Sequence, residues 1–168
     1  GSGAEGLLVE YALAMRDDGR SLDETEAQIR ATLPDAHLLL IPRTLENLVK
    51  NGRAPKLAGH LTQMLNIRLA VSPEWKSGEI KVIKKGRGAK RIVANTMADC
   101  LDFLAEHPGA SVRVLTTGAV EEQELVNQAL AGQDCVDAGT GPIGCTIATH
   151  VGVDVIAISY CPRYQPAN

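Results

Sequence analysis

The sequence predicts an α/β fold, a mixed β-sheet covered by helices. From residue 37 onward, short apolar runs of strand length alternate with longer segments whose apolar residues recur at helical spacing. Two of the short runs, 66–72 and 79–85, are separated only by a turn, which predicts an antiparallel hairpin inside this alternation. A sheet that combines a hairpin with helix-linked strands is expected to have mixed strand directions.

The composition fits one soluble domain, or one domain plus part of another. Of the 168 residues, 45% are hydrophobic but only 3% are aromatic, so the core has to consist of Leu, Ile, Val and Ala. The net charge of −3 argues against a general nucleic-acid binder. The sequence has no secretory signal and no apolar run near the ~18 residues of a membrane span, so a cytoplasmic location is expected.

The four cysteines form no CxxC pair and have no companion histidine at the spacing of zinc ligands. We therefore expect reduced, mostly buried thiols, no metal site and no cofactor. The residues concerned are Cys100, Cys135, Cys145 and Cys161.

The first 34 residues are expected to form two helices. Residues 4–16 place Leu7, Leu8, Tyr11, Ala12 and Met15 on one side. Ser21 and Glu24 have the spacing of a capping box for a second helix, residues 22–33, which Pro34 ends. Because no strand precedes these helices, we expect their first packing partner to lie outside this chain.

The remaining elements follow from apolar spacing and turn residues. Thr44 is expected to cap the helix at 45–50, and Asn51-Gly52 to close it in a left-handed turn. The helix at 89–107 has the inner face Ile92, Val93, Thr96, Met97, Cys100, Leu101 and Leu104. The other expected helices are 56–64, 120–131 and 143–149, and the expected strands are 37–42, 66–72, 79–85, 111–116, 134–138 and 153–160.

Residues 140–160 have the composition of an anion site. Glycines there allow backbone N–H groups to approach a ligand, and the Thr149 hydroxyl and His150 imidazole can complete the site. The alternative is a glycine-rich turn that His150 only caps. His150 is expected in a loop, and no nucleophile–base pair or metal cluster can be assembled around it from spacing; Cys145 and His150 are not a diagnostic pair.

Two groups of basic residues remain. Arg53 directly follows the Asn51-Gly52 turn and could offer paired N–H bonds to a carboxylate or phosphate, or be an ordinary surface arginine. The segment 81–91 contains six basic residues and no acid. It could be a nucleic-acid patch, a docking surface for an acidic partner or a solvated surface, and it has no aromatic residues for base stacking.

Four motifs in order resemble those of the DegV family, and the match covers nearly every residue here but only about the second half of a family member. Its Thr-Leu, Leu, Gly-Gly-Arg pattern is similar to Thr44-Leu45, Leu48 and Asn51-Gly52-Arg53. Its Asn-Ile-Lys strand and Val-Arg-Gly stretch resemble Asn66-Ile67-Arg68 and Gly86-Arg87-Gly88. Its closing glycine-rich segment matches Ile143, Gly144, Ile147, Thr149, His150 and Gly152, and Ser2–Val9 is similar to a helix start midway through the family chain.

The resemblance implies the C-terminal domain of a two-domain protein. Residues 1–34 would be two helices that continue from an N-terminal domain absent from this chain, residues 35–162 the α/β domain, and residues 163–168 a tail. Family members bind a long-chain fatty acid and hold its carboxylate where the two domains meet. Because the hydroxyls of the first domain are not in this chain, it would hold half of the site.

The resemblance also implies a binding protein and not an enzyme. In some bacteria, family members are the lipid-carrying subunit of a fatty acid kinase, whose catalytic subunit performs the phosphoryl transfer. The expected partners are therefore a long-chain fatty acid and that kinase subunit, with no stable nucleic acid. The matching positions give His150, Thr149, Arg53 and Gly152 to the carboxylate site, and Arg87, Lys84 and Lys90 to the surface that meets the kinase.

One departure from the family pattern concerns the carboxylate site. Val151-Gly152-Val153-Asp154 replaces Thr-Gly-Pro-Gly, which removes a hydroxyl and introduces a carboxylate that disfavours a nearby anion. The site survives if Asp154 points into solvent or pairs with Arg53. Two other function classes stay open: a regulatory or nucleic-acid-binding module that uses 81–91, and an enzyme that acts on a small carboxylate or phosphate through His150.

Overall fold

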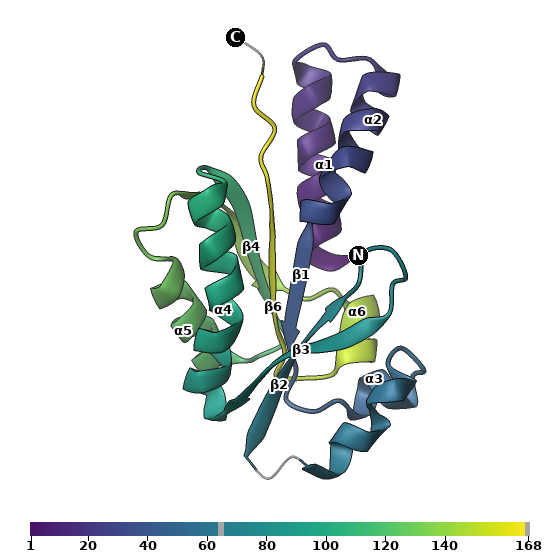
Figure 1. Ribbon diagram of the computed structural model, residues 1–168, viewed down its shortest axis with the longest axis vertical. Coiled ribbons are helices and arrows are strands. Elements are labelled where there is room, and N and C mark those ends of the chain that lie inside the picture. The colour runs from purple at the N-terminus through teal and green to yellow at the C-terminus, as the bar shows by residue number, and fades with distance from the viewer. Residues whose placement is uncertain (64–65, 167–168) are drawn as a thin grey trace.

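A mixed six-stranded sheet in the order β3-β2-β1-β6-β4-β5 forms the centre of the computed structural model, which describes residues 1–63 and 66–166 (Figure 1). Every neighbouring pair is antiparallel except β4 and β5, which are parallel. The predicted mixed sheet and its β2–β3 hairpin are confirmed. The strands are β1 His37–Ile41, β2 Ile67–Pro73, β3 Ile80–Arg87, β4 Ala110–Thr116, β5 Cys135–Pro142 and β6 Ile156–Cys161.

Helices cover both faces of the sheet, with α4 and α5 on one side and α1, α3 and α6 on the other (Figure 1). We call these sides the α4 face and the α1 face. The α-helices are α1 Ser2–Asp17, α2 Leu22–Thr32, α3 Glu46–Lys50, α4 Gly88–Glu106, α5 Val120–Leu130 and α6 Cys145–Val151, and two 3₁₀ helices are η1 Leu33–Asp35 and η2 Pro55–Gln63.

The α4 face holds the larger aliphatic core. The 19-residue helix α4 packs Ile92, Val93 and Met97 against buried side chains of β1, β4 and β6. Phe103 also lies in this core, although the sequence pattern did not place it on the inner face of the helix. It contacts the rings of His37 on β1 and Tyr160 on β6, so its burial depends on tertiary contacts.

The α1 face is covered by one long helix and several short elements. Helix α1 lies close to β6 because Gly3 leaves room for Ser159; a Cβ at Gly3 would lie 2.5 Å from the Ser159 hydroxyl oxygen. The predicted capping box of α2 is confirmed, with Ser21 and Glu24 bonded reciprocally. Leu7, Tyr11 and Met15, which were predicted on one side of this helix, are buried. Because α1 packs on β4 and β6 of this same chain, the expectation that its first packing partner lies outside the chain is wrong.

One edge of the sheet collects the loops that carry the predicted ligand residues. Ile156 at the start of β6 pairs with Ile41 at the end of β1 and with Thr116 at the end of β4. Because β2 and β3 continue the antiparallel order, the end of β3 at Arg87 lies toward this same edge. We call it the site edge.

Several predicted boundaries move at the site edge, although the order of elements holds. β5 runs to Pro142, four residues past the predicted end, because its glycine-rich part stays hydrogen-bonded to β4. Helix α6 begins at Cys145 and includes His150, so the prediction that His150 lies in a loop is wrong. β6 begins only at Ile156, because Asp154 has a left-handed backbone (φ 55°).

The predicted helix 56–64 is a 3₁₀ helix that starts at Pro55, and Met64, its predicted end, lies outside the described residues. Gly59 lowers the α-helical propensity of this segment. Asn66 has φ 68°, which delays the start of β2 to Ile67. Of the predicted tail 163–168, the last two residues also lie outside the described part.

The sequence predicted reduced and mostly buried thiols, and the structure buries two of the four. All four are free; Cys100 and Cys161 are buried, Cys135 is half-buried and Cys145 is exposed. Burial raises the pKa of Cys100 to about 12 and that of Cys161 to about 11. These two thiols are therefore protonated at neutral pH.

Candidate functional site at one edge of the sheet

His150 lies in the last turn of α6, half-buried at the site edge. Its Nδ1 atom is buried and has no hydrogen-bond partner among the described residues. A buried polar atom without a partner is uncommon, and it indicates a place where a ligand or water completes the bonding. No described backbone or side-chain group therefore receives a capping bond from this nitrogen.

The backbone after His150 is held by two threonines of the β4–α5 loop. Thr117 Oγ1 donates to Gly152 O (2.9 Å) and accepts from Val155 N–H (3.0 Å). Thr116 Oγ1 donates to Val155 O (3.0 Å) and accepts from Ala119 N–H (2.9 Å), in the loop just before α5. Two backbone bonds, from Thr117 N–H to Val155 O (2.9 Å) and from Asp154 N–H to Thr117 O (3.2 Å), join these hydroxyl bonds in fixing residues 152–155 after α6.

Helix α3 supports α6 from the other side. Asn51 Nδ2 donates to Thr149 O (3.1 Å), and Asn47 lies against Gly152. Gly152 has φ 89°, and a Cβ there would overlap the Asn47 amide, so this position requires glycine for conformation and for space. The Thr149 hydroxyl donates to Cys145 O within the helix (2.9 Å), so it is already engaged.

Arg53 is placed by the end of α3. Gly52 has φ 67°, its N–H donates to Val49 O, and Arg53 N–H donates to Leu48 O (2.9 Å), which is a Schellman motif. The predicted left-handed turn is confirmed at Gly52, whereas Asn51 is not left-handed. The Arg53 side chain is exposed and forms no ion pair among the described residues. Its backbone is thus fixed while its guanidinium stays available.

Asp154 does not pair with Arg53. Its nearest cation is Arg43, at 4.0 Å between Arg43 Nε and Asp154 Oδ2, and both side chains are about half or more exposed. An exposed pair at this distance contributes little to stability. The carboxylate also lies beside Gly118 of the β4–α5 loop. Asp154 therefore faces that loop and Arg43, which keeps the carboxylate outside the α3–α6 contact.

The basic segment 81–91 forms β3 and the start of α4. Lys81 and Lys84 are engaged, with Lys81 Nζ 3.1 Å from Glu74 and Lys84 Nζ 2.8 Å from Asp99. Arg87 and Lys90 are exposed and form no ion pair in the part of the chain that the structure describes. Gly86 allows α4 to approach β3, because a Cβ there would lie 2.6 Å from Ile92 N.

A mostly buried ion pair supports the same edge. Arg68 Nη1 on β2 is 2.8 Å from Glu122 Oε1 in the first turn of α5, with only 17% and 8% of the two side chains exposed. Nε and Nη2 of Arg68 have no partner among the described residues. The pair connects the hairpin to α5 on the α4 face.

The sequence did not single out the residues that hold the site together. The hydroxyls of Thr116 and Thr117 bond to residues that lie 39 and 35 positions away in the chain, and the Asn47 amide packs against Gly152. A pattern of neighbouring residues cannot reveal contacts of this kind. The only local signal was Thr-Thr-Gly at the end of a strand that precedes a helix.

The assembled edge offers an imidazole nitrogen and a fixed arginine, which suit a carboxylate or phosphate. Among the described residues there is no group of three or more His, Cys, Asp or Glu that could hold a metal ion. No helix in residues 1–63 and 66–166 is both long and apolar enough to cross a membrane.

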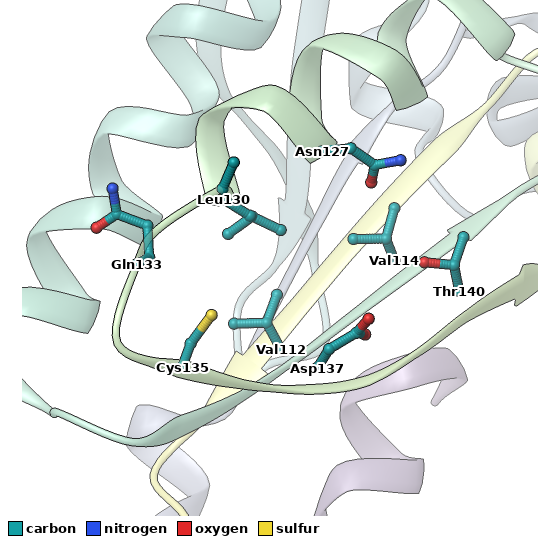
Figure 2. A pocket seen from close by; sticks show the side chains of 9 residues that line it. Val112, Val114, Asn127, Leu130, Gln133, Cys135, Asp137 and Thr140 are labelled. Atoms are coloured by element: carbon teal, nitrogen blue, oxygen red, sulfur yellow. The ribbon is translucent and has the colours of Figure 1, made fainter.

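A separate pocket of about 330 Å³ lies between the end of α5 and the outer strand β5. Figure 2 shows Val112, Val114 and Leu130 around its apolar part, with Asn127, Asp137 and Thr140 at its polar side. None of the predicted site residues lines this pocket.

Curated relatives match the chain over most of its length. A DegV domain-containing protein of Clostridium acetobutylicum is 27% identical over 164 residues, which is 95% of this chain and 56% of the relative. Another, from Lactococcus lactis, is 31% identical over 157 residues, 92% of this chain and 53% of the relative. The chain thus spans about half the length of the curated relatives it matches.

Solved structures have the same fold. A fatty acid binding DegV family protein of Streptococcus agalactiae matches with a TM-score of 0.81 at 22% identity, over 96% of this chain and 56% of that chain. A fatty-acid-binding DegV family protein of Thermus thermophilus gives 0.84 at 20% identity, over 95% and 57%. The fatty acid kinase B3 protein of Streptococcus pneumoniae, loaded with linoleic acid, gives 0.76 at 24% identity, over 92% and 54%.

The family model described as "Uncharacterised protein, DegV family" matches residues 1–163. This match, together with the relatives and the shared fold, shows that the chain belongs to the DegV family.

Proposed function

We propose that this chain carries half of a binding site for a long-chain fatty acid. The observation that carries the proposal is the buried, unpartnered Nδ1 of His150 at the site edge. A buried carboxylate needs hydrogen-bond donors, and a protonated imidazole nitrogen can supply one. The fatty acids named for solved members of the family support this choice of anion.

The four ligand residues have different roles in this proposal. His150 contacts the carboxylate directly, and Arg53 is the cation at the edge of the site. Gly152, which has a left-handed backbone and no side chain, lets the backbone of this loop come close to the carboxylate. Thr149 acts mainly through its backbone, because its carbonyl accepts from Asn51 and its hydroxyl is engaged within α6.

The remaining half of the site is assigned to an N-terminal domain that precedes residues 1–34, with residues 35–162 as the second domain. We expect a full-length protein that contains this chain to co-purify with a C14–C18 fatty acid, which organic extraction and mass spectrometry would identify. The 168-residue chain alone should take up added fatty acid weakly or not at all. Repeated full-length preparations without acyl species and without uptake of added lipid would refute the lipid role.

The head-group site is tested by His150→Ala in the full-length protein, with His107→Ala as a matched control outside the site. The substitution should weaken fatty acid binding by about 1.5–3 kcal/mol, the range for hydrogen bonds to charged groups. Arg53→Ala should act in the same direction, and Arg53→Lys should restore part of the binding. Asp154→Gly should improve binding only if Asp154 turns toward the ligand. Unfolding by His150→Ala without a separate loss of binding would favour a structural role.

We further propose that the chain presents the lipid to a kinase and is not itself the enzyme. Arg87 and Lys90 are exposed toward the site edge and supply the partner surface. Lys84 belongs to the same surface, although its ammonium is already paired with Asp99. The name of the Streptococcus pneumoniae relative, a fatty acid kinase protein, supports this partner. Such a surface speeds encounter with an acidic partner, and its effect shrinks as salt rises.

Arg87→Glu should abolish kinase-dependent acyl phosphorylation and leave fatty acid binding nearly unchanged. Arg30→Glu on α2, also an exposed arginine, is the matched control. If Arg87→Glu instead leaves kinase turnover intact and removes DNA or RNA binding, segment 81–91 is a nucleic-acid surface.

A further inference from the structure

Two asparagines of the α3 segment contact α6 on either side of His150. Asn51 Nδ2 donates to the carbonyl oxygen of Thr149, the residue before His150 (3.1 Å), and the Asn47 amide lies against Gly152, two residues after it. The two asparagines are four residues apart at the end of a helix, so they lie on the same side of it. The helix turn that carries the imidazole is therefore contacted by α3 at both of its ends.

The bond from Asn51 satisfies a carbonyl at the C-terminal end of α6. The last four carbonyls of an α-helix need donors from beyond the helix or from side chains. In α6, Gly152 N–H donates to Ala148 O (2.7 Å), and the backbone then leaves the helix with φ 89° at Gly152. Thr149 O is the next carbonyl, and its donor is Asn51, which lies 98 residues earlier in the chain. Asn51 thus caps α6 from another helix.

This hydrogen bond adds a direction that apolar packing between the two helices does not supply. Leu48 of α3 and Val151 of α6 are buried in the same core cluster on the α1 face, and such contacts are non-directional. A hydrogen bond, in contrast, requires its donor and acceptor to be close and nearly aligned. The Asn51 amide therefore fixes how α6 lies against α3, and with it the position of His150.

Asn51 is also fixed relative to Arg53. Only Gly52 separates the two residues, and Arg53 N–H donates to Leu48 O (2.9 Å), so residues 48–53 form one hydrogen-bonded turn. A shift of α6 relative to this turn would change the distance between the side chains of Arg53 and His150. One amide group therefore connects the two segments that carry the proposed carboxylate contacts.

We infer that Asn51 is a positioning residue that holds His150 and Arg53 in one arrangement without itself contacting the ligand. The inference rests on the proposed function, in which both of these side chains bind the carboxylate. Asn51 is exposed, so water can replace its bond to Thr149 O, and the bond contributes little to the free energy of unfolding. Its loss should loosen α6 locally and leave the rest of the fold intact.

The first measurement is a double-mutant cycle on fatty acid affinity in the full-length protein. Asn51→Ala should weaken binding about tenfold without lowering the melting temperature. In the His150→Ala background the same substitution should weaken binding less than about threefold, because the group that Asn51 positions is gone. Asn51→Gln keeps the amide on a longer side chain and should recover part of the affinity. A structural role would give the same loss in both backgrounds.

Asn95→Ala on α4 is the matched control. Asn95 is also exposed, and its Nδ2 also donates to a backbone carbonyl of another element, Lys85 O (2.8 Å). This substitution should leave the fatty acid affinity unchanged. Equal weakening by Asn51→Ala and Asn95→Ala, or equal losses from Asn51→Ala with and without the His150 imidazole, would overturn the inference.

A second measurement does not depend on the lipid. In the isotope-labelled 168-residue chain, Asn51→Ala should shift the NMR signals of the His150 ring and leave those of the His107 ring, which stacks on Phe103, in place. Unchanged His150 signals would contradict the positioning role. If the His150 signals move as expected but full-length preparations neither contain nor take up fatty acid, the lipid role fails and the positioning of His150 by Asn51 stands.

Discussion

The two faces of the sheet are stabilised in different ways. The α4 face rests on a 19-residue helix and an 11-residue helix that bury many large aliphatic side chains. Near the site edge, the α1 face instead uses the five-residue α3 and the seven-residue α6. Asn51 at the end of α3 bonds to α6, and Thr116 and Thr117 bond to residues 152–155 that follow α6. The proposed ligand residues lie where the α1 face has only these short helices, and we expect local opening there to cost less free energy than on the α4 face.

The largest expected effect contrasts Met97 and Leu48, which are both 1% exposed but lie on opposite faces. Met97→Ala should lower the free energy of unfolding by about 4 kcal/mol, because α4 cannot close the cavity. Leu48→Ala should cost only about 2 kcal/mol, because the short α3 can shift. Urea unfolding measures both values. Equal losses would contradict the contrast between the faces.

Arg68→Met tests the ion pair that joins the hairpin to α5. It leaves Glu122 buried without its partner, and we expect a loss of about 3 kcal/mol in unfolding free energy at pH 7. The double variant Arg68→Met with Glu122→Leu should recover much of that loss, since no unpaired charge remains. A double variant as unstable as the single one would mean that packing, and not charge, accounts for the effect.

Thr117→Val keeps the shape of the side chain and removes its hydrogen bonds to Gly152 and Val155. Two bonds at about 1 kcal/mol each predict a loss of about 2 kcal/mol. Amide exchange should rise in α6 and residues 152–155 and stay unchanged in α4. Faster exchange across both faces would mean that the faces open as one unit.

The smallest effect concerns His37 on the α4 face. Because burial lowers its folded pKa below the ordinary value of about 6.5, the unfolded chain takes up this proton first as pH falls. Stability should therefore decrease as pH drops through about 6.5. His37→Gln should remove this part of the pH dependence, with Asp35, Asp99, Asp102, Glu106, His107 and Tyr160 unchanged around it. Parallel pH profiles for both proteins would refute this assignment.

The sequence predicted the fold well wherever a local pattern determines the structure. The order of strands and helices, the capping box at Ser21 and the turn at Gly52 all depend on neighbouring residues. The prediction failed where backbone pairing or distant side chains determine the structure. Examples are the glycine-rich end of β5, the helical conformation of His150 and the burial of Phe103. The composition of residues 140–160 and the family resemblance led to the proposal of His150 and Gly152 as ligand residues, whereas Thr117 was missed because its partners lie 35 and 38 residues away.

The close approach at Gly86 also bears on how sequences of this kind can diverge. Any side chain at position 86 would meet the backbone of Arg91 and Ile92, so a substitution there has to move α4 as a whole. Arg87, one residue further on, is exposed and can change without that cost. Adjacent codons are therefore under opposite constraints, one fixed by backbone contact and the other free to adapt to a new partner.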